Sequence, residues 1–159
     1  MFIEIYTDGS CSGKSHVGGY AFVVIEDGKE DIKVYGIRKE TTNNAMELMA
    51  IVRAVKYIVT NKRLKKNDEV TIYSDSAYCV NSVEQKWIYF WEKNDWKTKQ
   101  GEPVKNLELW KEFLLLKRSC NMDISLKKVK GHSGVRYNEI VDNAAKQAIT
   151  NLNANSISK

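Results

Sequence analysis

The chain has 159 residues, of which 43% are hydrophobic, and these values fit one compact domain with a sizeable buried core. Its formal net charge of +5 and its pI near 9.0 favour a polyanionic partner without identifying one. No apolar run approaches the roughly 20 residues that cross a bilayer, and Met1 does not open a signal peptide. The composition therefore excludes a membrane protein and predicts a cytoplasmic one.

The first forty residues predict an antiparallel meander of three strands. Residues 2–7 alternate between apolar and polar side chains and run into Asp8-Gly9-Ser10, which is typical of a turn. Residues 19–25 form a second, more apolar strand. Asp27-Gly28 is a strong hairpin signal, and residues 32–37 supply the returning strand.

The middle of the chain changes to helical periodicity. Residues 43–60 predict a helix, with Thr42 or Asn43 as its N-cap. Its apolar stripe consists of Ala45, Leu48, Met49, Val52, Val55 and Val59. Residues 70–73 form a short apolar strand that ends at Ser74-Asp75-Ser76, where a helix could begin. The strand-helix-strand order favours parallel pairing of this strand with the sheet.

The last third predicts two more helices and one strand. The periodic pattern is interrupted over residues 86–105, which contain tryptophans, lysines and a glycine-containing turn. The helices are expected over residues 106–118 and 137–150, the strand over 123–129 and a loop over 130–134. Together the elements predict an α/β domain, with a five-stranded mixed sheet of three antiparallel and two parallel strands flanked by helices. We expect a single domain over 1–150 and a flexible tail over 151–159.

Four carboxylates stand at positions where a site could form. Asp8 and Asp75 follow strands, Glu47 lies in the first turn of a helix, and Asp142 lies beside the apolar stripe of the last helix. Each also has an ordinary explanation as a turn residue, a cap, a helix-dipole partner or a solvated side chain. If the four converge, their repulsion calls for a divalent cation. Oxygen ligands without a Cys/His cluster suit Mg²⁺ or Mn²⁺ rather than zinc.

Five segments resemble the signature segments of the ribonuclease HI family, in the family's order and over nearly the whole chain. They are YTDGSC at 6–11, TTNNAMEL at 41–48, YSDS at 73–76, VKGHSG at 129–134 and NEIVD at 138–142. The resemblance implies the ribonuclease H-like fold and an endonuclease that hydrolyses the RNA strand of an RNA–DNA hybrid. The expected partner is that hybrid, and the expected state is a monomer.

The resemblance also implies the roles of five residues. Asp8, Glu47, Asp75 and Asp142 would hold two metal ions, Mg²⁺ or Mn²⁺, once substrate is bound. In such sites one ion lowers the pKa of the attacking water and the other stabilises the leaving 3′ oxygen, which gives 5′-phosphate and 3′-hydroxyl products. His132, between two glycines, would assist proton transfer or product departure.

Substrate contacts are likewise implied by the resemblance. The residues expected to read the 2′-hydroxyls of the RNA strand are Asn43, Asn44 and the backbone near Cys11 and Ser12. Those expected along the DNA strand are Trp87, Trp91, Thr42 and Asn106, the last two at a phosphate. The asparagines could equally be helix caps, and the tryptophans could be packing residues, as we expect for Trp96. The basic segment 86–105 is expected to be a substrate-binding protrusion.

Two positions depart from the family pattern. Relatives often carry an asparagine that faces a phosphate where this chain has Lys14, which can still meet a phosphate. Many relatives have glutamine where this chain has Ala77, so one groove contact is expected to be missing.

Two alternatives remain open. One is another carboxylate nuclease of the same superfold, although the Asp-x-Glu pair typical of a proofreading exonuclease is absent at Asp8. The other is a module that binds hybrids without cutting them, although all four carboxylates are present. Cleavage assays on different duplexes separate these possibilities.

Overall fold

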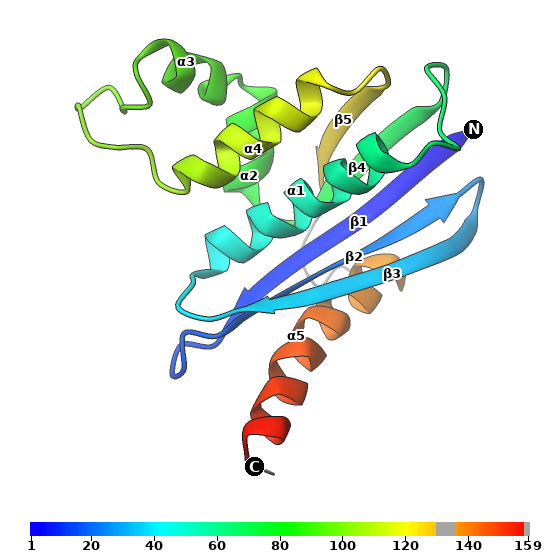
Figure 1. Ribbon diagram of the computed structural model, residues 1–159, viewed down its shortest axis with the longest axis vertical. Coiled ribbons are helices and arrows are strands. Elements are labelled where there is room, and N and C mark those ends of the chain that lie inside the picture. Colours follow the sequence, from blue (N-terminus) through cyan, green and yellow to red (C-terminus); the bar gives the residue numbers. More distant parts are fainter. Residues whose placement is uncertain (130–135, 158–159) are drawn as a thin grey trace.

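The sheet determines the architecture of the protein. The computed structural model describes residues 1–129 and 136–157, and it contains a five-stranded sheet in the order β3-β2-β1-β4-β5 (Figure 1). The strands are β1 (Phe2–Cys11), β2 (Gly18–Glu26), β3 (Lys29–Arg38), β4 (Glu69–Ser74) and β5 (Asp123–Lys128). β1, β2 and β3 pair antiparallel, whereas β4 pairs parallel with both β1 and β5. The predicted mixed sheet of three antiparallel and two parallel strands is confirmed.

Helices cover both faces of this sheet. They are α1 (Asn43–Thr60), α2 (Ala77–Glu84), α3 (Trp87–Lys93), α4 (Leu107–Arg118) and α5 (Arg136–Ile157). Alternation along the strands divides the core in two, because Ile3 and Ile5 pack with α1 while Ala21 and Val23 pack with Val141 of α5. Figure 1 shows α1 and α5 on opposite sides of the strands. The result is a three-layer α/β domain.

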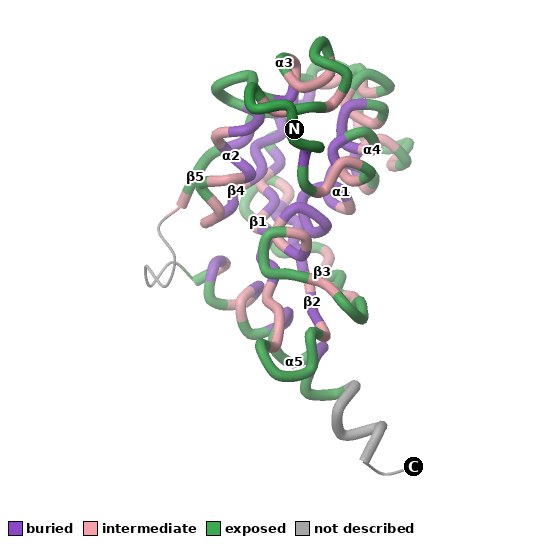
Figure 2. Tube along the Cα trace, turned by 90° about the vertical axis from the view of Figure 1, so that its left-hand side faces the viewer, coloured by how far each residue is buried: buried purple, intermediate pink, exposed green. Residues whose placement is uncertain are grey.

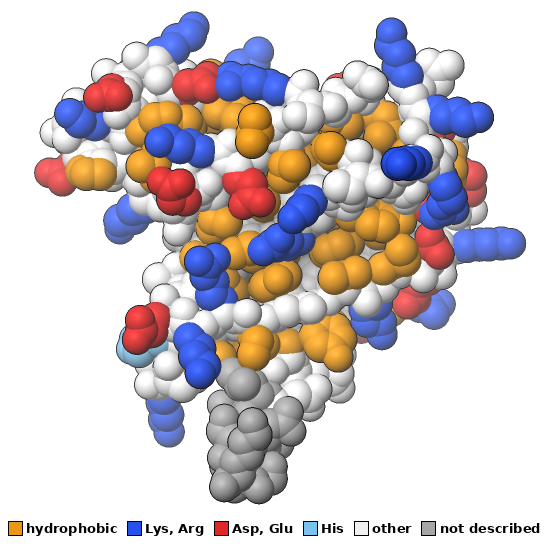
Figure 3. Space-filling model, in the orientation of Figure 1, with side chains coloured by type: hydrophobic (Ala, Val, Ile, Leu, Met, Phe, Trp, Pro, Cys, Tyr) orange, Lys and Arg blue, Asp and Glu red, His pale blue; other side chains and the backbone are white. Residues whose placement is uncertain are grey.

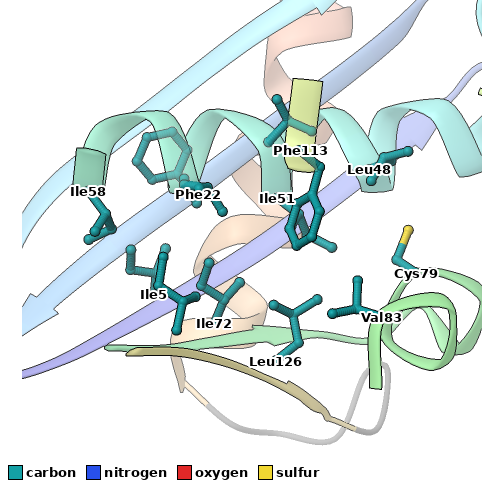
Figure 4. Close-up of a cluster of buried hydrophobic side chains, with 14 of the residues drawn as sticks. Ile5, Phe22, Leu48, Ile51, Ile58, Ile72, Cys79, Val83, Phe113 and Leu126 are labelled. Carbon is teal, nitrogen blue, oxygen red and sulfur yellow. The ribbon is translucent and has the colours of Figure 1, made fainter. Parts of the chain in front are cut away.

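The larger core lies between the sheet, α1, α2 and α4. Figure 4 shows Ile5 and Ile72 of the sheet facing Ile51 of α1, with Phe113 of α4 beside them. Figure 2 shows that buried residues run through the strands and α1. The buried side chains of α1 are Met46, Leu48, Met49, Ala50, Ile51, Val52, Ala54, Val55 and Ile58. The single stripe predicted for this helix was therefore too narrow, because α4 covers a second face.

The hairpins show one prediction that is confirmed and one that is wrong. Asp27 and Gly28 have φ of 49° and 87°, the positive values that a two-residue type I′ turn requires. Asp8-Gly9-Ser10 is no turn, since β1 continues to Cys11 and Gly9 pairs with Tyr20. A Cβ on Gly9 would collide with the backbone of Met46 and Glu47. The glycine is there because a helix crosses the strand closely.

Helix ends also refine the prediction. Thr42 caps α1 by accepting a hydrogen bond from the Ala45 N–H at 3.1 Å. The segment 86–105, for which no helix or strand bounds were predicted, contains α3, which an ion pair from Arg118 to Glu92 (2.6 Å) ties to the end of α4. α5 runs to Ile157, beyond the predicted end at residue 150. The flexibility of 151–159 stays a prediction. Within the described ranges, no helix combines the length and the apolar character that crossing a membrane requires.

Candidate active site

Two neighbouring parallel strands carry the first two carboxylates to one edge of the sheet. Tyr6 of β1 pairs with Tyr73 of β4. Two residues further along the chain stand Asp8, on β1, and Asp75, directly after the end of β4. Asp8 is buried, 4% exposed, and its Oδ1 accepts the Gly9 N–H at 2.9 Å. Ser76 caps α2 by accepting the Cys79 N–H at 3.2 Å. The cap of this helix is therefore a serine, and Asp75 is not needed for it.

Two helices bring the remaining carboxylates to the same place. Glu47 reaches Asp8 because α1 crosses β1 at Gly9 without an intervening side chain. One carboxylate oxygen from each of Asp8, Glu47 and Asp75 lies within 4.8 Å of the others. Asp142 of α5 lines a small depression with Asp8 and Asp75, so all four predicted carboxylates meet at this edge. Asp142 is also paired with Lys146, at 3.1 Å.

The electrostatics of this group are dominated by burial and by repulsion between carboxylates. Burial raises the pKa of Asp8 to about 7, and the charges of Asp75 and Asp142 add to the rise. Burial and then the charge of Asp8 raise the pKa of Glu47 as well. The buried Oε2 of Glu47 has no hydrogen-bond partner among the described residues. Oxygen donors that are buried, crowded and unsatisfied fit a hard divalent cation such as Mg²⁺.

The raised pKa of Asp8 predicts how the stability of the metal-free protein depends on pH. The Asp8 carboxyl releases its proton near pH 3.8 in the unfolded chain and near pH 7 in the folded one. At this group the folded state binds more protons between these values, so the contribution of Asp8 to stability is greatest at the acidic end and falls as the pH rises to 7. Across this window the melting temperature of the wild type in a chelator should decline relative to that of Asp8→Asn, which lacks the titrating carboxyl. The same dependence of melting temperature on pH in the two proteins would contradict the prediction.

A shallow groove runs from the carboxylates across the start of α1. Its lining comprises Asp8, Gly9, Ser10, Asn43, Asn44, Glu47, Asp75, Ser76, Ala77, Tyr78, Asp142 and Lys146. Asn43 also accepts the Cys11 N–H at 2.6 Å, which ties the end of β1 to the start of α1. Asn43 and Asn44 thus lie beside the carboxylates, and their contact with the RNA strand stays a prediction. Cys11 and Ser12 follow at the strand end, and Lys14 is exposed in the loop beyond them.

Thr42 is exposed at the N-terminus of α1, and Asn106 directly precedes α4. Asn106 lines a cavity between α1 and α4 together with Arg38, Thr41 and Arg53. Its Nδ2 donates to the Tyr78 hydroxyl at 3.3 Å, and the Trp110 indole N–H donates to the same hydroxyl at 3.0 Å. Asn106 is therefore held by the core, with Tyr78 linking it to the groove.

The aromatic residues of α3 divide into exposed and packed ones. Trp87 and Phe90 are 41% and 42% exposed and share a hollow with Lys99. Trp91 is half-buried, 6.0 Å from the ring of Trp110, so packing contributes to its role. Trp96 is half-buried and packs against the core, as expected.

The site residues that were not predicted from the sequence include Asn138, Lys146 and Phe90. Asn138 and Lys146 lie one helical turn before and after Asp142, so the spacing of four residues would have marked them. Phe90 lies three residues after Trp87 on α3. His132 lies outside the described residues, so its predicted role stays a prediction.

Comparison with known proteins matches the geometry to a family. The RNase H family matches residues 2–150. The ribonuclease H of Acetivibrio thermocellus is 46% identical over 148 residues, which cover 92% of this chain and 94% of that protein. The ribonuclease H of Caldicellulosiruptor saccharolyticus is 41% identical over 150 residues, which cover 94% and 97%.

Solved structures have the same fold. LC9-RNase H1, a type 1 RNase H with the type 2 active-site motif, superposes with a TM-score of 0.75 at 28% identity, over 92% of this chain and 71% of that one. A foamy viral protease-reverse transcriptase in complex with an RNA/DNA hybrid gives a TM-score of 0.76 at 24% identity, over 92% of this chain and 20% of that one.

Proposed function

Because the chain belongs to the ribonuclease H family and is a ribonuclease H, we propose that it hydrolyses the RNA strand of RNA–DNA hybrids with two divalent ions. The observation that carries the proposal is the convergence of Asp8, Glu47 and Asp75, with oxygens within 4.8 Å of one another. Asp142 would complete the set of ligands. Buried carboxylates that stand this close repel one another when they are charged, and a divalent cation bound between them removes that repulsion.

The residues of the site would have two roles: some would bind metal ions, and others would act on or contact the substrate. Divalent ions held there, Mg²⁺ or Mn²⁺, would lower the pKa of an attacking water and stabilise charge on the leaving 3′ oxygen. Glu47, with its unpaired buried oxygen, would be a ligand from the α1 side, and Asp142 from the α5 side. The products would carry a 5′ phosphate and a 3′ hydroxyl. His132 would move a proton or assist product departure.

Discrimination between RNA and DNA would depend on the groove at the start of α1. Only the 2′-hydroxyl and the shape of the minor groove distinguish the RNA strand, and both need polar groups within a few ångströms. Asn43 and Asn44 line the groove beside Asp8 and Glu47. Backbone groups at Cys11 and Ser12 lie next to Asn43 through its bond to the Cys11 N–H. Thr42 and Asn106 would hold a phosphate of the DNA strand.

The test is cleavage of an end-labelled RNA–DNA duplex in Mg²⁺ beside single-stranded RNA, double-stranded RNA and double-stranded DNA of the same sequence. We expect the RNA strand of the hybrid alone to be cut, and the new 5′ ends to release phosphate when a phosphatase is added. Equal cutting of double-stranded RNA or DNA would favour another nuclease of the superfold. Binding of the hybrid without cutting, at any divalent ion concentration, would overturn the proposal.

The α3 segment, residues 86–105, would hold the duplex outside the cleavage site. It carries five lysines and three acidic residues. In the face shown in Figure 3, cationic and anionic side chains both project at the upper left, where α3 lies. Lys93, Lys97 and Lys99 are exposed. Trp87 and Phe90 offer apolar surface beside them, and the Arg118–Glu92 pair anchors the helix.

Neutralising Lys93, Lys97 and Lys99 together should therefore raise KM and leave kcat nearly unchanged, because interactions with phosphates are shared by the ground state and the transition state. The slope of log affinity against log salt should flatten by about 0.9 for each phosphate that the variant no longer neutralises. Steady-state cleavage at several salt concentrations measures both. A matched triple change of Lys56, Lys62 and Lys66, which are exposed near the far end of α1, should leave KM unaltered. Equal effects of the two triple changes would rule out a specific role for the α3 segment.

A further inference from the structure

Three tyrosines form a row beneath the carboxylate site. The rings of Tyr6 and Tyr73 are stacked, with centroids 4.6 Å apart and planes at 15°. The ring of Tyr137 tilts against Tyr6 at 5.5 Å, and the guanidinium of Arg136 lies 5.7 Å from the Tyr137 ring. The Tyr73 hydroxyl donates to Glu4 at 3.2 Å, which fixes the other end of the row. Aromatic pairs and cation–π pairs stabilise a structure by more than the free energy of burying their surface.

The row joins the three elements that carry the aspartates. Tyr6 and Asp8 share a face of β1 because side chains alternate along a strand. Tyr73 lies on the paired strand β4, and Asp75 directly follows the end of that strand at Ser74. Tyr137 lies in the first turn of α5, five residues before Asp142. A displacement of Tyr137 relative to Tyr6 would thus change the separation between Asp142 and Asp8.

A second contact fixes α5 further along its length. A Cβ on Gly19 of β2 would collide with the carbonyl oxygen of Ala145, so the helix crosses the sheet there at close range. Ala144, Ala145 and Val141 are buried in this contact. Asp142 lies between the close crossing and the tyrosine row. Because α5 is held in place where it crosses Gly19, the packing of the three tyrosines sets the tilt of the first turns of α5. This tilt in turn sets the position of the Asp142 carboxylate.

We propose that Tyr6, Tyr73 and Tyr137 are positioning residues that set the place of Asp142 and thereby the affinity of the four-carboxylate site for divalent ions. This inference rests on the proposed function of the carboxylates as ligands. None of the three tyrosines is assigned a contact with substrate. Groups that orient ligands without touching the ion typically change metal affinity by about 10- to 100-fold when they are removed.

The test compares aliphatic and aromatic replacements. Tyr137→Leu and Tyr6→Leu remove a ring from the row, whereas Tyr137→Phe and Tyr6→Phe keep it. The control is Tyr57→Leu, which removes a half-buried ring that tilts against Phe22 at 6.1 Å on the α1 side of the sheet. Mn²⁺ binding to the substrate-free protein is measured by titration calorimetry. The Mg²⁺ concentration for half-maximal cleavage and the KM for the hybrid are measured separately.

We expect both leucine variants to bind Mn²⁺ about tenfold more weakly and to need correspondingly more Mg²⁺, with KM at saturating Mg²⁺ unchanged. The phenylalanine variants and Tyr57→Leu should bind Mn²⁺ as the wild type does. Wild-type Mn²⁺ affinity in either leucine variant, with circular dichroism that shows a folded protein, would overturn the inference. If one variant does not fold, the other decides. A wild-type protein that binds Mn²⁺ but cuts no hybrid would contradict the proposed function and leave this comparison of metal affinities valid.

Discussion

Replacing Asp8 with asparagine should abolish hydrolysis of a hybrid, preserve the fold and raise the melting temperature of the metal-free protein. Asp8 is 4% exposed and lines the groove with Glu47, Asp75 and Asp142, so its charge is costly without a cation. An amide introduced there keeps the acceptor for the Gly9 N–H and can donate to the unpaired Oε2 of Glu47. It is a poor ligand for a hard divalent ion. Loss of activity and gain of stability then have one cause.

Turnover of Asp8→Asn at saturating Mg²⁺ should fall by about 10⁴-fold or more, the scale seen when a group that acts as part of a catalytic unit is removed. Thermal unfolding in a chelator, followed by circular dichroism at pH 7.5, measures the gain of stability. Asp123→Asn is the control, because Asp123 is an exposed aspartate at the start of β5. It should leave both turnover and melting temperature unaltered. Near-wild-type turnover of Asp8→Asn would remove Asp8 from the ligand set.

Local signals predicted the parts of the fold that depend on neighbouring residues. Asp27-Gly28 formed the expected turn because the two positive φ values are a property of those residues themselves. Thr42 capped α1 as expected because the cap is also local: its hydroxyl accepts the N–H of Ala45, three residues later. Asp8-Gly9-Ser10 gave a false turn signal, because the use of Gly9 is set by a helix that lies almost forty residues later in the chain. The residues next to Gly9 in the sequence do not indicate that the backbone of a distant helix passes close to it.

Residues of the candidate site could be predicted from the sequence where they belong to a recognisable motif. The carboxylates stood at strand ends and on helices where a site could form, and the resemblance gave them their roles. Their convergence agrees with strand ends that meet at one edge. Lys146 and the tyrosine row were missed. Tyr6 and Tyr73 become neighbours only through the register of β1 and β4, and the alternation of each strand says nothing about that register. The roles of the site residues stay predictions until variants are assayed.

Gly9→Ala should impair both stability and catalysis although it adds a single methyl group. The new Cβ would meet the backbone of Met46 and Glu47, which cannot rotate away as a side chain can. Either β1 or the first turn of α1 must move, and overpacking of this kind costs about 3 kcal/mol. Movement of α1 carries Glu47 away from Asp8 and Asp75. A displacement near 1 Å can lower turnover by about 10²-fold.

The matched control for this prediction is Gly13→Ala, because a Cβ at the exposed Gly13 has no atom within 4 Å among the described residues. Urea unfolding and steady-state cleavage of the hybrid should show wild-type behaviour for Gly13→Ala and losses in both measurements for Gly9→Ala. Mn²⁺ binding separates the two consequences, because a general loss of stability leaves the affinity of the folded fraction unchanged while a displaced Glu47 weakens it. A Gly9→Ala protein that unfolds earlier but binds Mn²⁺ and turns over like the wild type would show that α1 accommodates the methyl group without moving Glu47. The close crossing would then matter for packing alone.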